Sequence, residues 1–487
     1  MQRKRWESDG MKRVVIIGAG PGGICTGIKL KEAGYDSFTI VEQADGVGGT
    51  WRHNTYPGCR CDVPSVLYSF SFAQKADWTA RYAAQPEILA YLENLAEQYG
   101  LMPHIRLNTR VQGAVWDDDA SLWRIALDDG SCLEAEVLVS AVGLFNEPNI
   151  PAIPGIESFS GPVMHSARWQ HDVPLDGRRI AVIGSAASAV QFVPEIAPVA
   201  GDLTVFQRTP NHVRFREADY TPEEQAAISS DPVLLHAERE KVAGWVDAMC
   251  KMQDTALLDI AAADCAQNAT VVEDEDTRQR LSPGYAFGGK RPLVSSDWYP
   301  TFNRPNVRLV TDAIARIEPD AVVGADGTRH PADVLIFATG FQTTRFLSAI
   351  PVQGRDGRKL DHVWADGARA YLGITTSGFP NLFMLYGPNT NNGSILHNIE
   401  CQADYVVRHM QRMEQDGLAW IDVRPEVLDA YNSNLQREIA AIPAWNTGVS
   451  GYYRTEGGLN VTQWPDGMQR YREMTSAPDA GAYDTGM

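Results

Sequence analysis

Short apolar runs separated by helical patterns predict that this chain contains parallel β-sheets. Residues 14–17 and 37–41 are continuous, β-branched and apolar, which is typical of strands buried on both faces. Apolar residues recur at helical spacing from 24 to 30, and Gly34 follows as a helix C-cap. The same strand–helix–strand order returns over residues 179–206. The sequence therefore predicts an α/β fold with two Rossmann-like, dinucleotide-binding units.

The remaining patterns predict shorter elements around these two units. Amphipathic helices are predicted over residues 85–99 and 397–416. Alternating segments predict short antiparallel strands at 105–107, 114–116, 123–127 and 132–133, with a hairpin turn at Asp128-Asp129-Gly130. Buried strands are expected at 136–143, at 330–341, where the chain should return to the first unit, and at 381–388, as a last central strand.

Changes in composition divide the chain into segments. Pro-rich residues 148–154 mark a crossing between the units, and residues 216–285 are acidic and alanine-rich, which predicts a helical insertion. The predicted segments are a flexible N-terminal extension (1–11), a first dinucleotide-binding domain (12–150 and 336–475, with substrate-side loops), a second (151–215 and 286–335) that carries the insertion (216–285), and a disordered tail (476–487).

Composition narrows the class of protein. The 487 residues are 44% hydrophobic and 21% charged, as in ordinary globular proteins, and the net charge of −18 argues against nucleic acid or an anionic membrane as partner. No apolar run is long enough to span a bilayer, and the basic, polar start lacks the apolar core of a signal peptide. Seven scattered cysteines argue against a disulfide framework or a metal site, and they favour the reducing cytoplasm.

The first apolar strand runs into a loop with G-x-G-x-x-G spacing. Gly18 permits the tight turn, Gly20 lets backbone approach a pyrophosphate, and Gly23 lets the next helix pack closely. Glu42 ends the second strand, where its carboxylate can accept hydrogen bonds from both hydroxyls of an adenosine ribose. A glycine-rich structural turn is the alternative, but strand, helix and acid together favour a dinucleotide site.

The second unit repeats this design with two differences. Its loop, Gly184-Ser185-Ala186-Ala187-Ser188-Ala189, has alanine at the second and third glycine positions, which leaves a relict structural repeat as an alternative. Arg208 stands 24 positions after the first glycine, the place that Glu42 has in the first unit. Arginine followed by Thr209 is suited to a 2′-phosphate, so the second unit is expected to bind the phosphorylated dinucleotide.

A further glycine-rich segment, residues 46–62, follows the first unit's second strand. Its glycines let the backbone lie against a flat ligand, and Trp51 can cover an aromatic ring. Arg60 and Asp62 lie in a tight loop that is expected to be buried. A surface loop with a structural Asp–Arg pair is the alternative.

Three motifs carry a family resemblance. Residues 159–169 read F-x-G-x-x-x-H-x-x-x-W on the linker between the two units, residues 49–62 carry G-x-W, Y-P-G and a final Asp, and Lys290-Arg291 follows two glycines. Together they resemble the class B flavoprotein monooxygenases, and among these the Baeyer–Villiger monooxygenases. The resemblance covers residues 12–471 and is weakest in the insertion; Gln170 departs from the family's usual Pro or Asp.

The resemblance implies an enzyme that uses FAD in the first unit and NADPH in the second to insert one oxygen atom of O2 beside a ketone carbonyl, giving an ester or lactone through a C4a-peroxyflavin. Arg291 would be the catalytic cation, with Asp62 as its partner. Lys290, Arg208 and Thr209 would hold the 2′-phosphate. The other implied positions are the hinge residues Phe159, Gly161, His165 and Trp169, and the cofactor contacts Gly18, Gly20, Gly23, Glu42, Gly49, Thr50, Trp51, Arg60, Cys61, Tyr68, Val111, Gly184, Ser185, Ala186, Ser188, Thr339 and Gly340.

Three other functions share parts of this pattern. A flavin monooxygenase that oxidises N or S atoms has both units, although the Asp62/Arg291 pair favours the Baeyer–Villiger type. A pyridine nucleotide–disulfide reductase needs C-x-x-x-x-C beside the flavin, where this chain has only Cys59-x-Cys61. The third is a non-enzymatic binding protein on a degenerate fold. The expected partners are a small ketone and O2, and the chain is expected to be a monomer or weak homo-oligomer.

Overall fold

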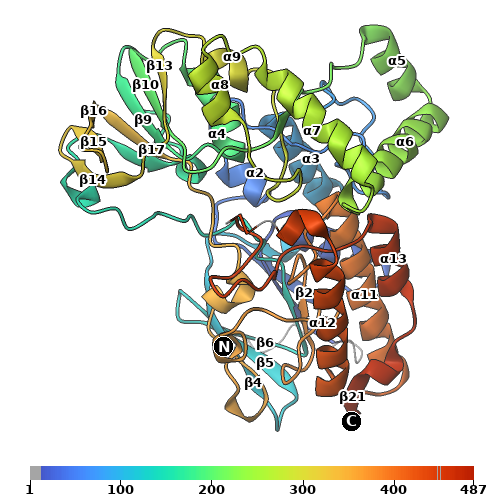
Figure 1. Cartoon of the computed structure of the whole chain (residues 1–487). Helices are drawn as coiled ribbons and strands as arrows, with labels where there is room; N and C mark the ends of the chain where they lie inside the picture. The colour runs from blue at the N-terminus through green and yellow to red at the C-terminus, as the bar shows by residue number, and fades with distance from the viewer. Residues whose placement is uncertain (1–11, 447, 450) are drawn as a thin grey trace.

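Two five-stranded parallel sheets form the centres of two lobes in the computed structural model, which describes residues 12–446, 448, 449 and 451–487 (Figure 1). The predicted extension 1–11 lies outside the described residues. In spatial order the first sheet contains β19 (Leu382–Met384), β7 (Val137–Ser140), β1 (Val14–Ile17), β2 (Phe38–Val41) and β3 (Ile105–Arg106). The second contains β8 (Val163–His165), β17 (Val334–Phe337), β9 (Arg179–Ile183), β10 (Asp202–Phe206) and β13 (Val307–Val310).

The two sheets are wound in the same way. Each central strand, β1 or β9, leads into a helix, α1 (Pro21–Glu32) or α4 (Ala187–Ile196), and then into the strand beside it. An antiparallel meander precedes the inner strand on the other side: β4 (Val111–Asp117), β5 (Leu122–Leu127) and β6 (Cys132–Ala135) before β7, and β14 (Ile314–Glu318), β15 (Ala321–Gly324) and β16 (Arg329–Pro331) before β17. The predicted pair of Rossmann-like units is confirmed.

Helices cover the first sheet from both the N-terminal and the C-terminal parts of the chain. α11 (Ile395–Gln415) packs between α1 and α13 (Met468–Ser476). All four residues of β1 and of β7 are buried, as expected for parallel strands covered on both faces. The other elements of this lobe are α2 (Thr50–His53), α3 (Gln85–Gln98), α10 (Leu360–Val363), α12 (Pro425–Ala440), β18 (Val352–Gln353), β20 (Trp420–Val423) and β21 (Tyr483–Gly486). Short 3₁₀ helices lie at Met102–His104, Ile156–Ser158, Ser166–Arg168, Phe346–Ala349, Arg355–Gly357, Pro443–Asn446 and Ala480–Ala482.

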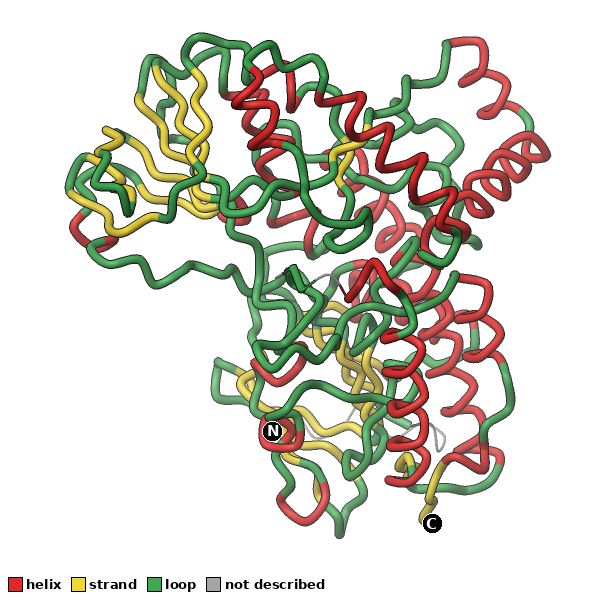
Figure 2. The backbone as a smooth tube through the Cα atoms, viewed as in Figure 1, coloured by secondary structure: helices red, strands yellow, loops and turns green. Residues whose placement is uncertain are grey.

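Four helices occupy the segment that was expected to be a helical insertion. They are α5 (Pro222–Ser230), α6 (Pro232–Cys250), α7 (Thr255–Ala269) and α8 (Glu275–Leu281), between β11 (Val213–Arg214) and β12 (Leu293–Val294), with α9 (Trp298–Thr301) after them. They extend across the top of the molecule (Figure 2), and α8 lies against the second sheet, where Arg280 donates to the Leu309 carbonyl oxygen of β13 at 3.0 Å. The buried Arg239 of α6 donates hydrogen bonds to the carbonyl oxygens of Val66 (2.7 Å) and Ser69 (3.0 Å), which attaches this segment to the first lobe.

Three strands differ from the sequence predictions. β3 pairs parallel to β2 at the edge of the first sheet and is not part of the antiparallel meander. β17 pairs with β9 and β8, so the strand expected to return the chain to the first unit belongs to the second, and the boundary predicted at residue 335 cuts through it. β19 is an edge strand, not a central one. Local sequence does not fix a strand's partner, because pairing depends on the whole sheet.

The prediction of a disordered tail is wrong. β21 pairs antiparallel with β20. The tail carboxylate Asp479 accepts a hydrogen bond from the Tyr405 hydroxyl (2.5 Å) and lies 3.2 Å from Nε2 of His409, both on α11. The Tyr483 hydroxyl contacts Thr375 Oγ1 at 3.0 Å. These buried contacts are invisible to the local composition, which is rich in Ala, Gly and Asp.

Candidate active site

The first glycine loop is shaped partly by the chain's own packing. Gly18 has φ +104°, and a Cβ there would lie 2.6 Å from the Ala141 carbonyl oxygen; a Cβ on Gly23 would lie 1.9 Å from the Gly18 oxygen. Gly20 differs, because its nearest protein neighbour would be the Gly49 Cα at 3.4 Å. Gly20 also caps α1 without any side-chain hydrogen bond, so no cap side chain competes with an anion for the first amides of the helix.

Glu42 is held rigidly at the end of β2. Its carboxylate is 6% exposed and accepts hydrogen bonds from the amides of Ala19 and Ala44, both at 2.8 Å. Two carboxylate oxygens can accept about four hydrogen bonds, so acceptor capacity remains for a ribose diol. Glu42 therefore fixes the glycine loop, and its predicted contact with a ribose stays a prediction.

The second glycine loop has the same first turn as the first loop, but its helix packs less closely against the strand before it. Gly184 has φ +111°, and a Cβ there would lie 2.3 Å from the Ala338 oxygen at the end of β17. Ala189, at the third glycine position, is fully buried, so this helix accommodates a methyl group where α1 does not. The N-cap Ala186 provides no side-chain hydrogen bond, and the Ser185 carbonyl oxygen is held by the Asn211 amide at 3.0 Å.

Two cations meet near the end of β10. Burial, and then the charge of nearby Arg208, lower the pKa of Lys290 to about 8. Arg208 is exposed and Thr209 is half-buried beside it. Two positive charges held together, one of them partly desolvated, form a site that suits a dianionic phosphate.

Asp62 and Arg291, 229 residues apart in the chain, form a bidentate ion pair. Arg291 donates from Nε and Nη2 to the two carboxylate oxygens of Asp62, each at 2.7 Å. Burial acts to raise the pKa of Asp62, but the Arg291 guanidinium holds it below its usual range; the Asp62 charge in turn raises the pKa of Arg291. The two side chains are 25% and 33% exposed, and Asp62 takes two of the five N–H donors of Arg291.

Three tyrosines near Arg291 were not among the predicted site residues. Burial raises the pKa of Tyr386 and of Tyr453, and the Arg291 charge acts against both rises. Tyr452 packs edge-on against Tyr453, with ring centroids 4.8 Å apart, and against Phe145, at 5.9 Å. Tyr386 has φ +55°, a strained conformation for a residue of its size. The only signals in the sequence were the Tyr-Gly-Pro-Asn turn after β19 and the adjacent tyrosines at 452 and 453.

Further predicted contacts surround the loop of residues 49–62. Trp51 donates from Nε1 to the Tyr68 hydroxyl at 3.0 Å, which brings two predicted positions together. Gly49 has φ +56°, and Thr50 begins α2. Gln191 of α4, which sequence reasoning missed, accepts from the Tyr56 hydroxyl (2.9 Å), so the second unit docks directly on this loop.

Gln191 also contacts the next predicted position. Its side-chain amide donates to the Arg60 carbonyl oxygen at 3.1 Å. Cys61 is buried, and its sulfur accepts from the Val63 amide at 3.4 Å. Val111 lies elsewhere, in the apolar core with Val15 and Ile17.

The predicted hinge residues lie on the second sheet and its helix. Gly161 is pressed against Asp333, whose carbonyl oxygen would be 2.1 Å from a Cβ, and His165 ends the edge strand β8. Burial lowers the pKa of His165 to about 4, and its Nδ1 accepts from the Ala167 amide at 3.1 Å. Phe159 packs in the second sheet's core, and Trp169 contacts Phe192 of α4. The fingerprint segment is thus part of the second unit, not a linker between the units.

The linkers that cross between the lobes run side by side. Pro148 and Phe341 form an antiparallel bridge, and the Asn149 amide donates to the Gly340 oxygen at 2.8 Å. Thr339 Oγ1 donates to the Asn149 oxygen at 2.5 Å. Thr339 and Gly340 therefore lie at the crossing. Their predicted cofactor contact, like the hinge role of the fingerprint residues, stays a prediction.

Within the part of the chain that the structure describes, no helix is long and apolar enough to pass through a membrane. Among the same residues, no group of three or more His, Cys, Asp or Glu side chains is arranged to hold a metal ion.

Comparison with known proteins gives a consistent result. Residues 15–223 match the family model described as pyridine nucleotide-disulphide oxidoreductase. A protein of Streptomyces coelicolor named Baeyer-Villiger monooxygenase is 38% identical over 97% of this chain and 92% of its own length. Phenazine N-monooxygenase PhzNO1 of Lysobacter antibioticus is 32% identical over 88% and 87%. The crystal structure of cyclohexanone monooxygenase from Rhodococcus sp. Phi1 bound to NADP+ superposes with a TM-score of 0.87 at 30% identity, covering 98% of this chain and 100% of that one.

Proposed function

The chain belongs to the Baeyer–Villiger monooxygenases, which are NADPH-dependent flavin monooxygenases, and on that premise we propose that it inserts one oxygen atom of O2 beside the carbonyl of a ketone, giving an ester or lactone. Its cofactors are FAD and NADPH. The single observation that carries the proposal is the bidentate Asp62–Arg291 pair. The carboxylate comes from the loop that follows the first unit's second strand and the guanidinium from the segment that follows the helical insertion, so the pair connects distant parts of the chain.

The residues of the two units would bind different parts of the two cofactors. Gly20 and the N-terminus of α1 would receive the pyrophosphate of FAD, and Glu42 its ribose diol. Lys290 and Arg208 would hold the 2′-phosphate of NADPH. The reduced flavin supplies the chemistry that activates O2.

Arg291 would stabilise the negative charge that develops on oxygen during the reaction. It stays protonated because Asp62 raises its pKa, and Asp62 occupies only two of its five N–H donors. The remaining donors can therefore face the reacting oxygen atoms in a partly desolvated site.

The test is an assay of the FAD-loaded enzyme with NADPH, 18O2 and either cyclohexanone or a thioether. The proposal expects NADPH consumption matched by ε-caprolactone that carries one 18O atom. Release of hydrogen peroxide has to be measured in parallel, because uncoupled NADPH oxidation would mimic turnover. Sulfoxide formation from the thioether with no lactone from cyclohexanone would contradict the proposal.

The second candidate is oxidation of nitrogen atoms. It is favoured by the relative named phenazine N-monooxygenase, which is 32% identical to this chain. Oxidation of nitrogen needs an electrophilic oxygen and gives no oxyanion on a substrate carbon, so it would not need Arg291 in the same way. Retention of N-oxide formation in Arg291→Ala, with loss of ester formation, would separate the two activities.

A further inference from the structure

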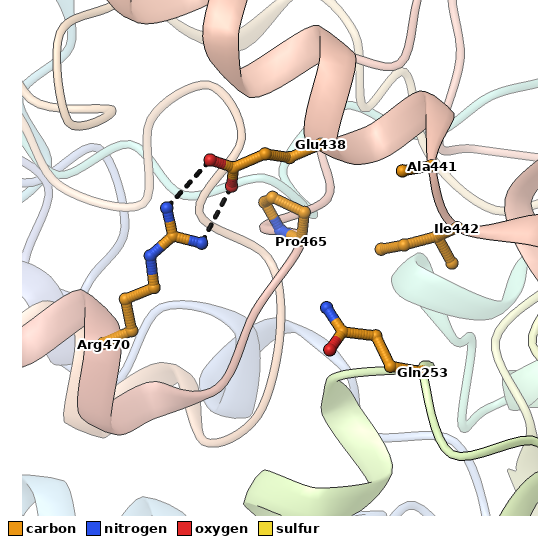
Figure 3. A pocket seen from close by; sticks show the side chains of 6 residues that line it. All are labelled: Gln253, Glu438, Ala441, Ile442, Pro465 and Arg470. Atoms are coloured by element: carbon orange, nitrogen blue, oxygen red, sulfur yellow. Dashed lines mark hydrogen bonds and ion pairs between the residues drawn. The ribbon is translucent and has the colours of Figure 1, made fainter.

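A cavity of about 250 Å³ opens between the loop after α6 and the C-terminal helices (Figure 3). Buried Ile442 and Pro465 form an apolar part of its wall. Arg470 and Glu438 lie on one side as a bidentate ion pair, with contacts of 2.8 and 2.9 Å. The side-chain amide of Gln253 points into the cavity (Figure 3).

The lining favours an uncharged ligand with an apolar body. Among the lining residues the charge of Arg470 is balanced by Glu438. Asp466 also pairs with Arg470, at 2.9 Å, so the cluster of three carries a net charge of −1, which disfavours an anionic ligand. The Gln253 amide is neutral and can donate to a carbonyl oxygen or accept from a hydroxyl. A ketone with an apolar substituent has this chemistry.

The chain from the cavity leads directly towards Arg291. Three peptide steps separate Gln253 from Cys250, a span of at most about 11 Å. Burial raises the pKa of Cys250 to about 12, and the Arg291 guanidinium is close enough to act against that rise. The end of α6 therefore runs from the neighbourhood of Arg291 to the cavity.

Asn392 forms hydrogen bonds to two segments that lead to the cavity, the end of α6 and the segment before Pro465. Its side-chain amide donates to the carbonyl oxygens of Cys250 (2.8 Å) and Trp464 (2.9 Å). Trp464 precedes Pro465, which lines the cavity. Hydrogen bonds from the Asn392 side chain to backbone carbonyl groups thus connect the end of α6 to the segment that carries Pro465.

One flexible side chain, that of Met252, adjoins a cavity-lining residue in the chain and packs against the segment that carries Arg291. Met252 precedes Gln253, and its sulfur would lie 2.8 Å from a Cβ on Gly288, three positions before Arg291. Ala444 closes the other side of Gly288, at 3.4 Å. Met252 has φ +51°, a conformation rare for a side chain of its kind and common at functional sites. Methionine has three rotatable bonds and adapts its shape readily.

We propose that the cavity is an outer binding site for apolar ketones on their way to Arg291, and that Met252 is the side chain that moves to admit them. The proposal rests on the proposed function for the chemistry at Arg291. A large apolar substituent remains among Ile442 and Pro465 while the carbonyl passes Met252. Small ketones make little use of the cavity, so its residues set the preference for substrate size.

The first experiment measures kcat and KM of the FAD-loaded enzyme for cyclohexanone and for 4-phenylcyclohexanone. Gln253→Trp fills the cavity, Met252→Trp narrows the passage, and Gln267→Trp, at an exposed position of α7, is the matched control. Both test variants should lower kcat/KM for 4-phenylcyclohexanone about tenfold, mainly through KM, with little change for cyclohexanone. NADPH oxidation without ketone should stay as in the unchanged enzyme. Equal effects on both ketones, or none, would overturn the proposal.

A second readout does not depend on turnover. Gln253→Cys and Gln267→Cys are made in a Cys132→Ser background, because Cys132 is an exposed native thiol, and are labelled with a maleimide. Saturating 4-phenylcyclohexanone should slow labelling at position 253 severalfold and leave position 267 unchanged. An unchanged rate at 253 overturns the outer site. An enzyme that makes no lactone but shows this protection retains the outer site and loses the proposed reaction, so the two failures are distinguishable.

Discussion

The two glycine loops share their first turn and differ in how closely the helix follows. Gly18 and Gly184 both have positive φ and both press against the end of the neighbouring strand, at Ala141 and Ala338. The third position separates them, because α1 has no room for a Cβ at Gly23 whereas α4 buries the methyl group of Ala189. The first glycine is thus required by the fold itself, and the third reflects only helix–strand distance.

The residues that are predicted to contact the ribose of each cofactor, Glu42 and Arg208, also differ in burial. Glu42 is buried and fixed by two backbone amides, whereas Arg208 is exposed and works with a half-buried lysine. A buried, preorganised site suits a cofactor that stays bound, and an exposed cationic site suits one that exchanges in every turnover. Alanines in the second loop are therefore compatible with dinucleotide binding and do not indicate a relict repeat.

Exchanging the residues at the third glycine positions, Gly23 and Ala189, should give the largest effect on stability and on bound FAD. Gly23→Ala places a Cβ against the Gly18 oxygen, so α1 has to shift; we expect a loss of stability on the order of 3 kcal/mol and of bound FAD. The reciprocal Ala189→Gly should cost only about 1 kcal/mol, the helix penalty of glycine. Thermal unfolding and the flavin absorbance per protein measure both. Similar behaviour of the two variants would remove the distinction between the loops.

Removing the cation that the second unit contributes should abolish oxygen insertion and spare the first unit. Arg291→Ala should keep FAD bound and reducible by NADPH, and should lower ester formation at least about 100-fold because a stabilising charge is lost. The measurements are the flavin spectrum, anaerobic reduction and product mass. Asp62→Asn/Arg291→Ala, which leaves no unpaired carboxylate, controls for a folding defect. Ordinary ketone oxidation by either variant would refute the assignment.

The phosphate site should discriminate between the two nicotinamide cofactors. Arg208→Ala should raise KM for NADPH about 10- to 100-fold, as expected for lost hydrogen bonds to a charged group, and leave KM for NADH nearly unchanged. Arg437→Ala, at an exposed position of α12, is the matched control. Equal changes for both cofactors would place Arg208 outside the phosphate site.

The smallest expected effect is a pH dependence of the affinity for NADPH. Only the second unit should show it, because that unit contains Lys290. The pKa of Lys290 is about 8 without ligand, and a bound phosphate dianion favours its charged form. Affinity for NADPH should be constant between about pH 7 and pH 8, where the phosphate is a dianion, and fall above pH 8, by at most about tenfold per pH unit. Lys290→Arg, which stays charged, should flatten the profile. An identical profile for NADH would show that another group titrates.

The strand–loop–helix geometry of both glycine loops could be predicted from the sequence because each loop is a local motif. The sequence also anticipated the Asp62–Arg291 pair, since the resemblance placed both residues. It did not predict that β3 joins the parallel sheet or that the tail is ordered, because both depend on partners far away in the chain. Gln191 and Tyr452 were missed for the same reason: their roles come from tertiary contacts, without a local spacing to announce them.

The position of β19 has a consequence for how the protein is made. The second sheet contains its last strand once residue 337 has been synthesised, whereas the first sheet waits for residues 382–384. During translation, the unit that begins first is therefore finished last, after the second unit already has its full set of strands. A nascent chain stalled before residue 380 would expose the open edge of β7, a template for aggregation that nothing nearby in the sequence could cover.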